Sequence, residues 1–252
     1  MDWLLLGGGA FVAGLVDAVV GGGGLIQIPL LLSVFPAASI AVLFGTNKVS
    51  SIAGTLGAGI RYARAVSIPW RVAGWSAASA FFGAWIGAQV VSLLPKDVLK
   101  PLVVLMLVLV GTYTFIKKDF GKLEQHTLST KLIVPVSLIA GAVIGFYDGF
   151  FGPGTGSFLI FVFVRWFGFD FLKASASAKI VNVSTNLAAI ASFALGEGIL
   201  WKIGGVMAIA NLAGSQLGAH LALRHGNGFI RWMFLILVVV LVSKLGWELI
   251  PH

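Results

Sequence analysis

The sequence predicts an all-α membrane protein that crosses the bilayer many times and consists of two homologous repeats. The 252 residues have a mean hydropathy of +1.01, and only 10% of them are charged, whereas a soluble domain carries about 25%. Several apolar runs reach the length of about 20 residues that a transmembrane helix needs. A motif of the first half also returns in the second half at a constant spacing.

The repeated motif joins an aspartate, a glycine-rich break and a lysine. Asp17 precedes the break 21–24 and Lys48 follows it, while Asp148 precedes the break 152–156 and Lys179 follows that one. The two aspartates are 131 positions apart, and so are the two lysines. Further pairs keep this spacing: Trp70 and Trp201, Gly83 and Gly214, Gly87 and Gly218. We therefore predict an internal duplication, with repeat 1 at 1–116, a cytoplasmic linker at 117–131 and repeat 2 at 132–252.

Each repeat holds five apolar runs, which we interpret as membrane segments. They lie at 3–20, 25–34, 38–60, 72–94 and 101–116 in the first repeat, and at 132–151, 156–167, 172–195, 203–223 and 229–249 in the second. The second run of each repeat is short, since a ten-residue helix rises only about 15 Å, half of the ~30 Å hydrocarbon core. Each short run follows a glycine-rich break. Irregular backbone is tolerated inside a membrane only where protein buries it or where it lines a wet cavity, so the paired breaks indicate a site.

The relative orientation of the repeats depends on whether the short runs return the chain across the membrane. If they do, the repeats are inverted, and eleven Lys and Arg residues face the cytoplasm against four outside. If they do not, the repeats are parallel, and the ratio falls to nine against six. Cytoplasmic loops of membrane proteins are rich in Lys and Arg, which favours the inverted arrangement. Inverted repeats with broken helices near the midplane are also a common plan among transporters.

Composition argues against several other classes of protein. The net charge of +8 comes from basic residues in short loops, which is the usual bias of membrane proteins, so we expect no nucleic-acid partner. The chain has no cysteine and therefore no disulfide or thiolate metal site. Its four histidines do not share a helical face at ligand spacing, so no metal site or cofactor is expected. A close nucleophile–base pair is also missing, which argues against an enzyme.

The lysines are the sharpest signal for function. Lys48 lies near the centre of the run 38–60, where a lysine costs about 2.5–3.5 kcal/mol on insertion scales, and Lys179 is placed similarly. Such residues need a partner or a wet cavity. Small polar residues surround both: Thr46, Asn47 and Ser50 near the first, Ser177 and Asn182 near the second. We interpret the lysines as a pair of ammonium groups that bind an anionic substrate. The alternative is an ion pair with Asp17 or Asp148, and the two states can alternate if the anion displaces a carboxylate.

The glycine-rich breaks are the second signal. A helix that begins at such a break directs free backbone N–H groups and the positive end of its dipole toward it, which suits an anion. The residues predicted to contribute are Gly22, Gly23, Gly24, Gly154, Thr155 and Gly156. The alternative is tight packing between helices, a role that we assign to the pairs Gly83 with Gly87 and Gly214 with Gly218.

Asp17 and Asp148 lie one turn before the breaks, and two roles are open for them. They can carry a proton and thereby couple anion movement to the proton gradient, or they can accept hydrogen bonds from the bared N–H groups of the break. Gln27, just past the first break, is predicted to line the path of the anion. Its counterpart is Phe158, so the repeats differ at this position.

The aspartate, glycine and lysine motifs of both halves resemble those of the TauE/SafE sulfite exporter family, and the resemblance covers nearly the whole chain. It implies a permease of the cell (inner) membrane for sulfite or a related sulfur-containing anion such as a sulfonate. With the residues above, it leads us to expect a secondary transporter that binds a small anion at the midplane between the repeats. An anion channel with similar residues is the alternative, because a channel does not need two closed gates.

Overall fold

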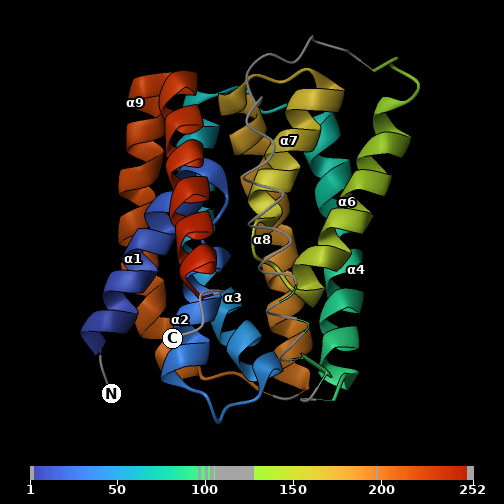
Figure 1. The fold of residues 1–252 in the computed structure, drawn as a ribbon. Coiled ribbons are helices and arrows are strands. Elements are labelled where there is room, and N and C mark those ends of the chain that lie inside the picture. Colours follow the sequence, from blue (N-terminus) through green and yellow to red (C-terminus); the bar gives the residue numbers. More distant parts are fainter. Residues whose placement is uncertain are drawn as a thin grey trace.

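The computed structural model describes residues 3–95, 98, 99, 102, 105, 128–196 and 198–248, and within these ranges the chain is helical without strands (Figure 1). The first half contains α1 (Trp3–Val20), α2 (Gly24–Val34), α3 (Ile40–Ala65) and α4 (Trp70–Leu93). The second half contains α6 (Ile133–Phe150), α7 (Thr155–Phe167), α8 (Phe171–Leu195) and α9 (Trp201–Glu248). Most of the predicted segment 101–116, and residues 117–127 of the predicted linker, lie outside the described residues.

The helices agree closely with the predicted membrane segments. Within the described residues, five helices are long and apolar enough to cross a membrane: α1, α4, α6, α8 and the part of α9 at Trp201–Gly226. Helix α3 has 26 residues, but its polar residues make it less apolar than these five. Helix α9 is interrupted at Gly226, where φ is +68° and ψ is −158°. It therefore forms two helical parts, which correspond to the predicted runs 203–223 and 229–249.

Helices α2 and α7 are the two short segments, with 11 and 13 residues. Helices α1 and α2 form a hairpin that is open at the lower end of the bundle in Figure 1, and α6 and α7 form one that is open at the upper end. The tips of the two hairpins meet inside the bundle. Gly21, with φ +78°, lies so close to Gly156 that a Cβ atom on it would be 2.4 Å from the backbone of Gly156. Only glycine meets both demands, a positive φ and this close approach.

The two halves pack mainly against each other. Helix α1 packs against α9, and its counterpart α6 packs against α4. Helix α3 packs against α9 and α8 packs against α4, while α3 and α8 also contact one another. The largest cluster of buried apolar residues draws on both halves, from Val16 in α1 to Ala222 in α9. Each half thus packs its first and third helices against the fourth helix of the other half.

Glycine in α4 allows α6 to approach closely, and this makes a prediction about stability. A Cβ atom at Gly83 would lie 2.3 Å from the carbonyl oxygen of Ala142, whereas one at Gly74 would meet nothing within 4 Å. We expect Gly83→Ala to destabilise the protein by about 1–3 kcal/mol, the usual cost of overpacking. Gly74→Ala, on the same helix, should be neutral or slightly stabilising. Thermal unfolding in detergent checks this, and equal midpoints for the two variants would contradict it.

Candidate functional site

Both membrane lysines are held by aspartates of the opposite half. Lys48 Nζ lies 2.8 Å from Asp148 Oδ2, and Lys179 Nζ lies 2.8 Å from Asp17 Oδ2. Lys179 also donates a hydrogen bond to the main-chain oxygen of Asp17. Each lysine is the ninth residue of its helix, about 12 Å from the helix start. Because α3 begins at the lower end of the bundle and α8 at the upper end (Figure 1), the two pairs approach the centre from opposite ends.

The two ion pairs differ in their exposure. The side chains of Lys48 and Asp148 are 5% and 6% exposed, and that of Lys179 is 1% exposed, but that of Asp17 is 18% exposed. Removal of one member of a buried pair is costly, because it leaves an uncompensated charge. Asp17 is therefore the charged group of the four that most readily meets water or a ligand.

A polar hollow of about 30 Å³ lies between the pairs. Its lining consists of charged and amide side chains, three residues with hydroxyl groups and the glycines of both breaks: Asp17, Gly21, Gly24, Asn47, Lys48, Ser51, Thr55, Asp148, Gly152, Thr155, Gly156, Asn182 and Asn186. A volume of this size holds one or two water molecules. A larger anion requires the helices around the hollow to move apart.

The hollow is lined by one face of α3 and the equivalent face of α8. Lys48, Ser51 and Thr55 follow one another at helical spacing along α3. Lys179, Asn182 and Asn186 occupy the positions 131 residues further on, along α8. Lys179 does not itself line the hollow, but its ammonium group bonds to Asp17, which does. Ser51, Thr55 and Asn186 were not among the predicted site residues, although their spacing from the lysines would have identified them.

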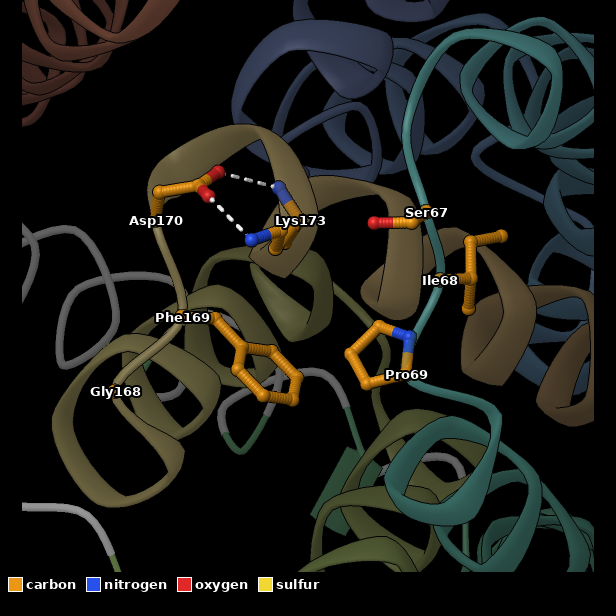
Figure 2. A pocket seen from close by; sticks show the side chains of 7 residues that line it. All are labelled: Ser67, Ile68, Pro69, Gly168, Phe169, Asp170 and Lys173. Atoms are coloured by element: carbon orange, nitrogen blue, oxygen red, sulfur yellow. Dashed lines mark hydrogen bonds and ion pairs between the residues drawn. The ribbon is translucent and has the colours of Figure 1, made fainter.

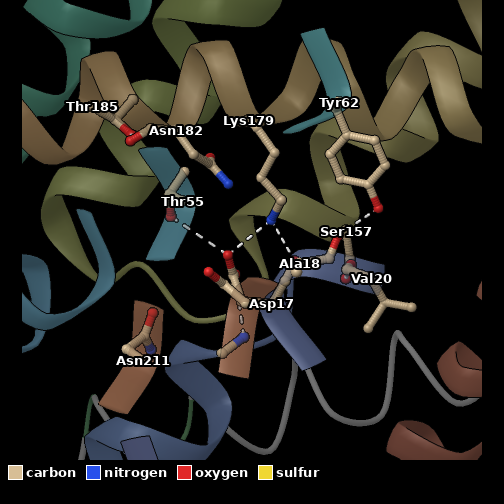
Figure 3. Close-up of polar contacts among 12 residues, drawn as sticks. Asp17, Ala18, Val20, Thr55, Tyr62, Ser157, Lys179, Asn182, Thr185 and Asn211 are labelled. Atoms are coloured by element: carbon tan, nitrogen blue, oxygen red, sulfur yellow. Dashed lines mark hydrogen bonds and ion pairs between the residues drawn. The ribbon is translucent and has the colours of Figure 1, made fainter. Parts of the chain in front are cut away.

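Asp17 sits at the end of α1 among donors from three other elements, as Figure 3 shows. In addition to Lys179, the hydroxyl group of Thr55 donates to Asp17 Oδ2 at 3.5 Å. The backbone N–H of Gly23 donates to Asp17 Oδ1 at 3.4 Å. Asp17 therefore accepts a hydrogen bond from the first break and forms an ion pair with Lys179 at the same time. It has a structural role and also lines the hollow.

The backbone of each break is satisfied by side chains from other helices. The hydroxyl groups of Tyr62 and Ser157 donate to the carbonyl oxygens of Ala18 and Val20 at 3.0 and 2.7 Å (Figure 3). In the second half, the Tyr147 hydroxyl donates to the carbonyl oxygen of Pro153 at 2.5 Å. These bonds satisfy main-chain oxygen atoms at the breaks, as is necessary for irregular backbone inside a membrane.

The amides at the hollow have unused hydrogen-bonding capacity. Asn47 Oδ1 and Asn182 Oδ1 are buried, and neither has a hydrogen-bond partner among the described residues. The oxygen and nitrogen of an amide can exchange places by a flip of the side chain. Each asparagine can therefore offer either a donor or an acceptor to a molecule in the hollow.

Several predicted site residues lie away from the hollow. Gln27 and Ser50 are fully buried and bond to each other, Nε2 to Oγ, at 3.0 Å. Thr46 accepts a hydrogen bond from the backbone N–H of Leu200 at 3.1 Å and so links α3 to the start of α9. Ser177 is buried in α8 and does not line the hollow. Gln27 therefore contacts a neighbouring helix in this conformation and does not line the central space.

Some of the residues predicted at the glycine-rich breaks line the hollow, and the others lie beside it in the breaks. Gly24, Thr155 and Gly156 line the hollow. Gly22 and Gly23 lie in the first break and do not line the hollow, and the backbone N–H of Gly23 bonds to Asp17. Gly154 caps the start of α7 with φ +81°. The starts of both short helices therefore reach the hollow.

A larger hollow of about 390 Å³ lies at the surface between the α3–α4 and α7–α8 loops (Figure 2). Its charged residues already bond to each other. Asp170 caps the start of α8 by accepting from the Lys173 N–H at 2.9 Å, and the Lys173 ammonium lies 3.4 Å from the same carboxylate. Elsewhere in the described residues, no group of three His, Cys, Asp or Glu side chains is placed to hold a metal ion. The central hollow is therefore the candidate site.

The fold and the site together define a multi-pass helical protein of the cell membrane, of the transporter class. The family follows from comparison with known proteins: the chain belongs to the sulfite exporter TauE/SafE family, whose model matches residues 6–245. This confirms the family that the sequence motifs resemble.

Relatives of similar length support the same class. The chain is 35% identical to a probable membrane transporter protein, ORF9, of Sinorhizobium sp, over 94% of this chain and 89% of the relative. It is 35% identical to the probable membrane transporter protein YfcA of Escherichia coli K12, over 95% and 87% of the two chains. It is also 34% identical to a probable membrane transporter protein of Haemophilus influenzae, over 94% and 92%. No solved structure matches the chain.

Proposed function

We propose that this protein is a secondary transporter of a small anion, sulfite or a related organosulfur anion, which binds in the central hollow. The observation that carries the proposal is that each membrane lysine forms an ion pair with an aspartate of the other half: Lys48 with Asp148, and Lys179 with Asp17. The pairs flank a polar space that the starts of two short helices also reach. Ammonium groups, amides and helix N-termini are the groups that replace the hydration shell of an anion. The name of the family supplies the sulfur chemistry.

Binding of the anion requires an ion pair to open. Both ammonium groups are occupied by carboxylates, and the hollow is too small for an oxyanion in this conformation. An anion that enters replaces a carboxylate as the partner of a lysine. Because each pair links one half to the other, this exchange also loosens the contact between the halves. The occupied site then permits the rocking motion that alternates access between the two sides.

The displaced carboxylate provides a reason for coupling to protons. A carboxylate that loses its cationic partner inside a membrane is more stable in the neutral form. Each anion that binds a lysine therefore favours the uptake of a proton by the released aspartate. Asp17 is the better candidate, since its side chain is 18% exposed and that of Asp148 is 6% exposed.

The repeats are proposed to be inverted, with the upper end of the bundle in Figure 1 in the cytoplasm. The hairpins of α1–α2 and α6–α7 open at opposite ends, which supports inversion. At the upper end, basic residues gather near the helix ends: Arg61, Arg64, Arg71, Lys131, Arg165, Lys173 and Arg224. Lys202 lies at the start of α9, at the lower end. This asymmetry is the bias expected of cytoplasmic loops.

Proteoliposomes that contain a pH-sensitive dye test the proposed function. We expect saturable uptake of sulfite, accompanied by acidification of the interior, with protein-free liposomes as the blank. Saturable uptake without a pH change would reject the proton coupling and keep the anion site. Uptake that does not saturate, together with single-channel currents, would support an anion channel. Absence of any anion flux would reject both.

A further inference from the structure

A second cationic hollow lies at the outside of the bundle, between the C-terminal end of α3 and the first part of α9. It has a volume of about 510 Å³, and its lining combines two arginines with small and apolar residues: Gly57, Ile60, Arg61, Arg64, Ala65, Gln216 and Leu223. It shares no residue with the central hollow. The anion path proposed above makes no use of it.

The two arginines of this hollow are available for a ligand. The guanidinium group of Arg61 is oriented by one hydrogen bond, from Nη1 to the carbonyl oxygen of Gln216 at 2.9 Å. Arg64 is exposed at the last turn of α3. Within the part of the chain that the structure describes, neither guanidinium group forms a salt bridge with a carboxylate. Guanidinium groups bind phosphate through charge-assisted hydrogen bonds. Here two of them lack a carboxylate partner, and one is oriented by its hydrogen bond to the backbone.

The surface next to the arginines carries exposed apolar side chains. Leu56 and Ile60 of α3 are 48% and 47% exposed, and Leu217 of α9 is 42% exposed. Ile60 lines the hollow beside Arg61, and the other two lie close to its lining residues Gly57 and Gln216 in sequence. The hollow thus combines two cationic groups with apolar side chains beside them. A phospholipid has matching parts, with its phosphate at the membrane border and its acyl chains in the core.

We infer that this hollow binds the headgroup phosphate of an anionic phospholipid, with Arg61 and Arg64 as its ligands and Ile60 beside the glycerol carbons. Basic pockets between membrane helices on the cytoplasmic side are suited to anionic headgroups. In the proposed orientation the lipid belongs to the cytoplasmic leaflet. The inference depends on the membrane fold and not on transport, so it stands or fails independently of the proposed function.

Native mass spectrometry of the delipidated protein tests this inference. The protein is titrated separately with phosphatidylglycerol, phosphatidylcholine and inorganic phosphate. We expect phosphatidylglycerol to bind at least about tenfold more tightly than phosphatidylcholine, because the net charge of its headgroup matches the two arginines. Arg61→Gln/Arg64→Gln should remove this preference. Arg71→Gln changes an exposed arginine at the same end of the bundle, outside the hollow, and should keep it.

The single variant Arg64→Gln tests the site with little risk of misfolding, since Arg64 is exposed and forms no hydrogen bond or salt bridge with the described residues. It should weaken binding of phosphatidylglycerol severalfold while the unfolding temperature without lipid stays unchanged. Equal binding of both lipids by the wild type, or full retention of the preference by the double variant, would overturn the inference. Tight binding of inorganic phosphate without binding of phosphatidylglycerol would also overturn it, because the site would then hold a free anion.

Discussion

Replacement of Lys48 by methionine is expected to lower sulfite uptake into proteoliposomes at least about 100-fold. Methionine keeps most of the length of the side chain and removes its charge. The anion then loses a charge-assisted partner worth up to about 3 kcal/mol, which corresponds to about two orders of magnitude. Asp148, which is 6% exposed, would also lose its cationic partner. The measurement is the initial rate of uptake at equal amounts of reconstituted protein.

The matched control is Lys202→Met, which removes a positive charge at the exposed start of α9, from a residue that does not line the hollow. Its uptake should remain within about twofold of the wild type, because solvent screens an exposed charge. A rate for Lys48→Met that equals the rate of this control would show that Lys48 does not bind the transported anion.

The same lysine should have a large effect on stability. Loss of one member of a buried ion pair costs about 3–5 kcal/mol, because the remaining charge is left without compensation. We therefore expect Lys48→Met to lower the free energy of unfolding in detergent by that amount. The double variant Lys48→Met/Asp148→Asn has no uncompensated charge and should recover most of the loss. Denaturant unfolding, followed by circular dichroism, measures both.

The double variant also separates folding from transport. It should be nearly as stable as the wild type and still fail to take up sulfite, because the ammonium group is absent. If it instead remained as unstable as Lys48→Met, the ion pair to Asp148 would not be the cause of the instability. Recovered stability together with recovered transport would mean that the site needs only neutrality and not a positive charge.

Much of the fold could be predicted because the relevant signals are local. The apolar runs predicted the bounds of most described helices to within two or three residues, although α3 ends at Ala65, five residues beyond the predicted run. The short runs predicted α2 and α7. The glycine at position 21 is explained by its positive φ and its contact with Gly156. The pairs of helices that pack together could not be predicted, since the contacts of α1 with α9 and of α4 with α6 join residues far apart in the sequence.

The candidate site was predicted in part for the same reason. A lysine in an apolar run is costly wherever the chain folds, so Lys48 and Lys179 were identifiable from the sequence. Gln27 was expected on the anion path, yet it bonds to Ser50 on the neighbouring helix, because polarity alone does not tell which face of a helix a residue occupies. Thr55 and Asn186 were missed, although they lie two turns beyond the lysines on the same helical faces.

The exchange of packing partners between the halves has a consequence for biosynthesis. While the ribosome is still making the second half, α1 has no α9 to lie against and α4 has no α6. During that interval Asp17 and Lys48 also lack the oppositely charged residues that later neutralise them. The nascent N-terminal helices therefore lack these partners until the C-terminal helices have been synthesised, and until then they contact each other or the insertion machinery. Maturation becomes a single late event in which assembly of the bundle and neutralisation of its interior charges occur together.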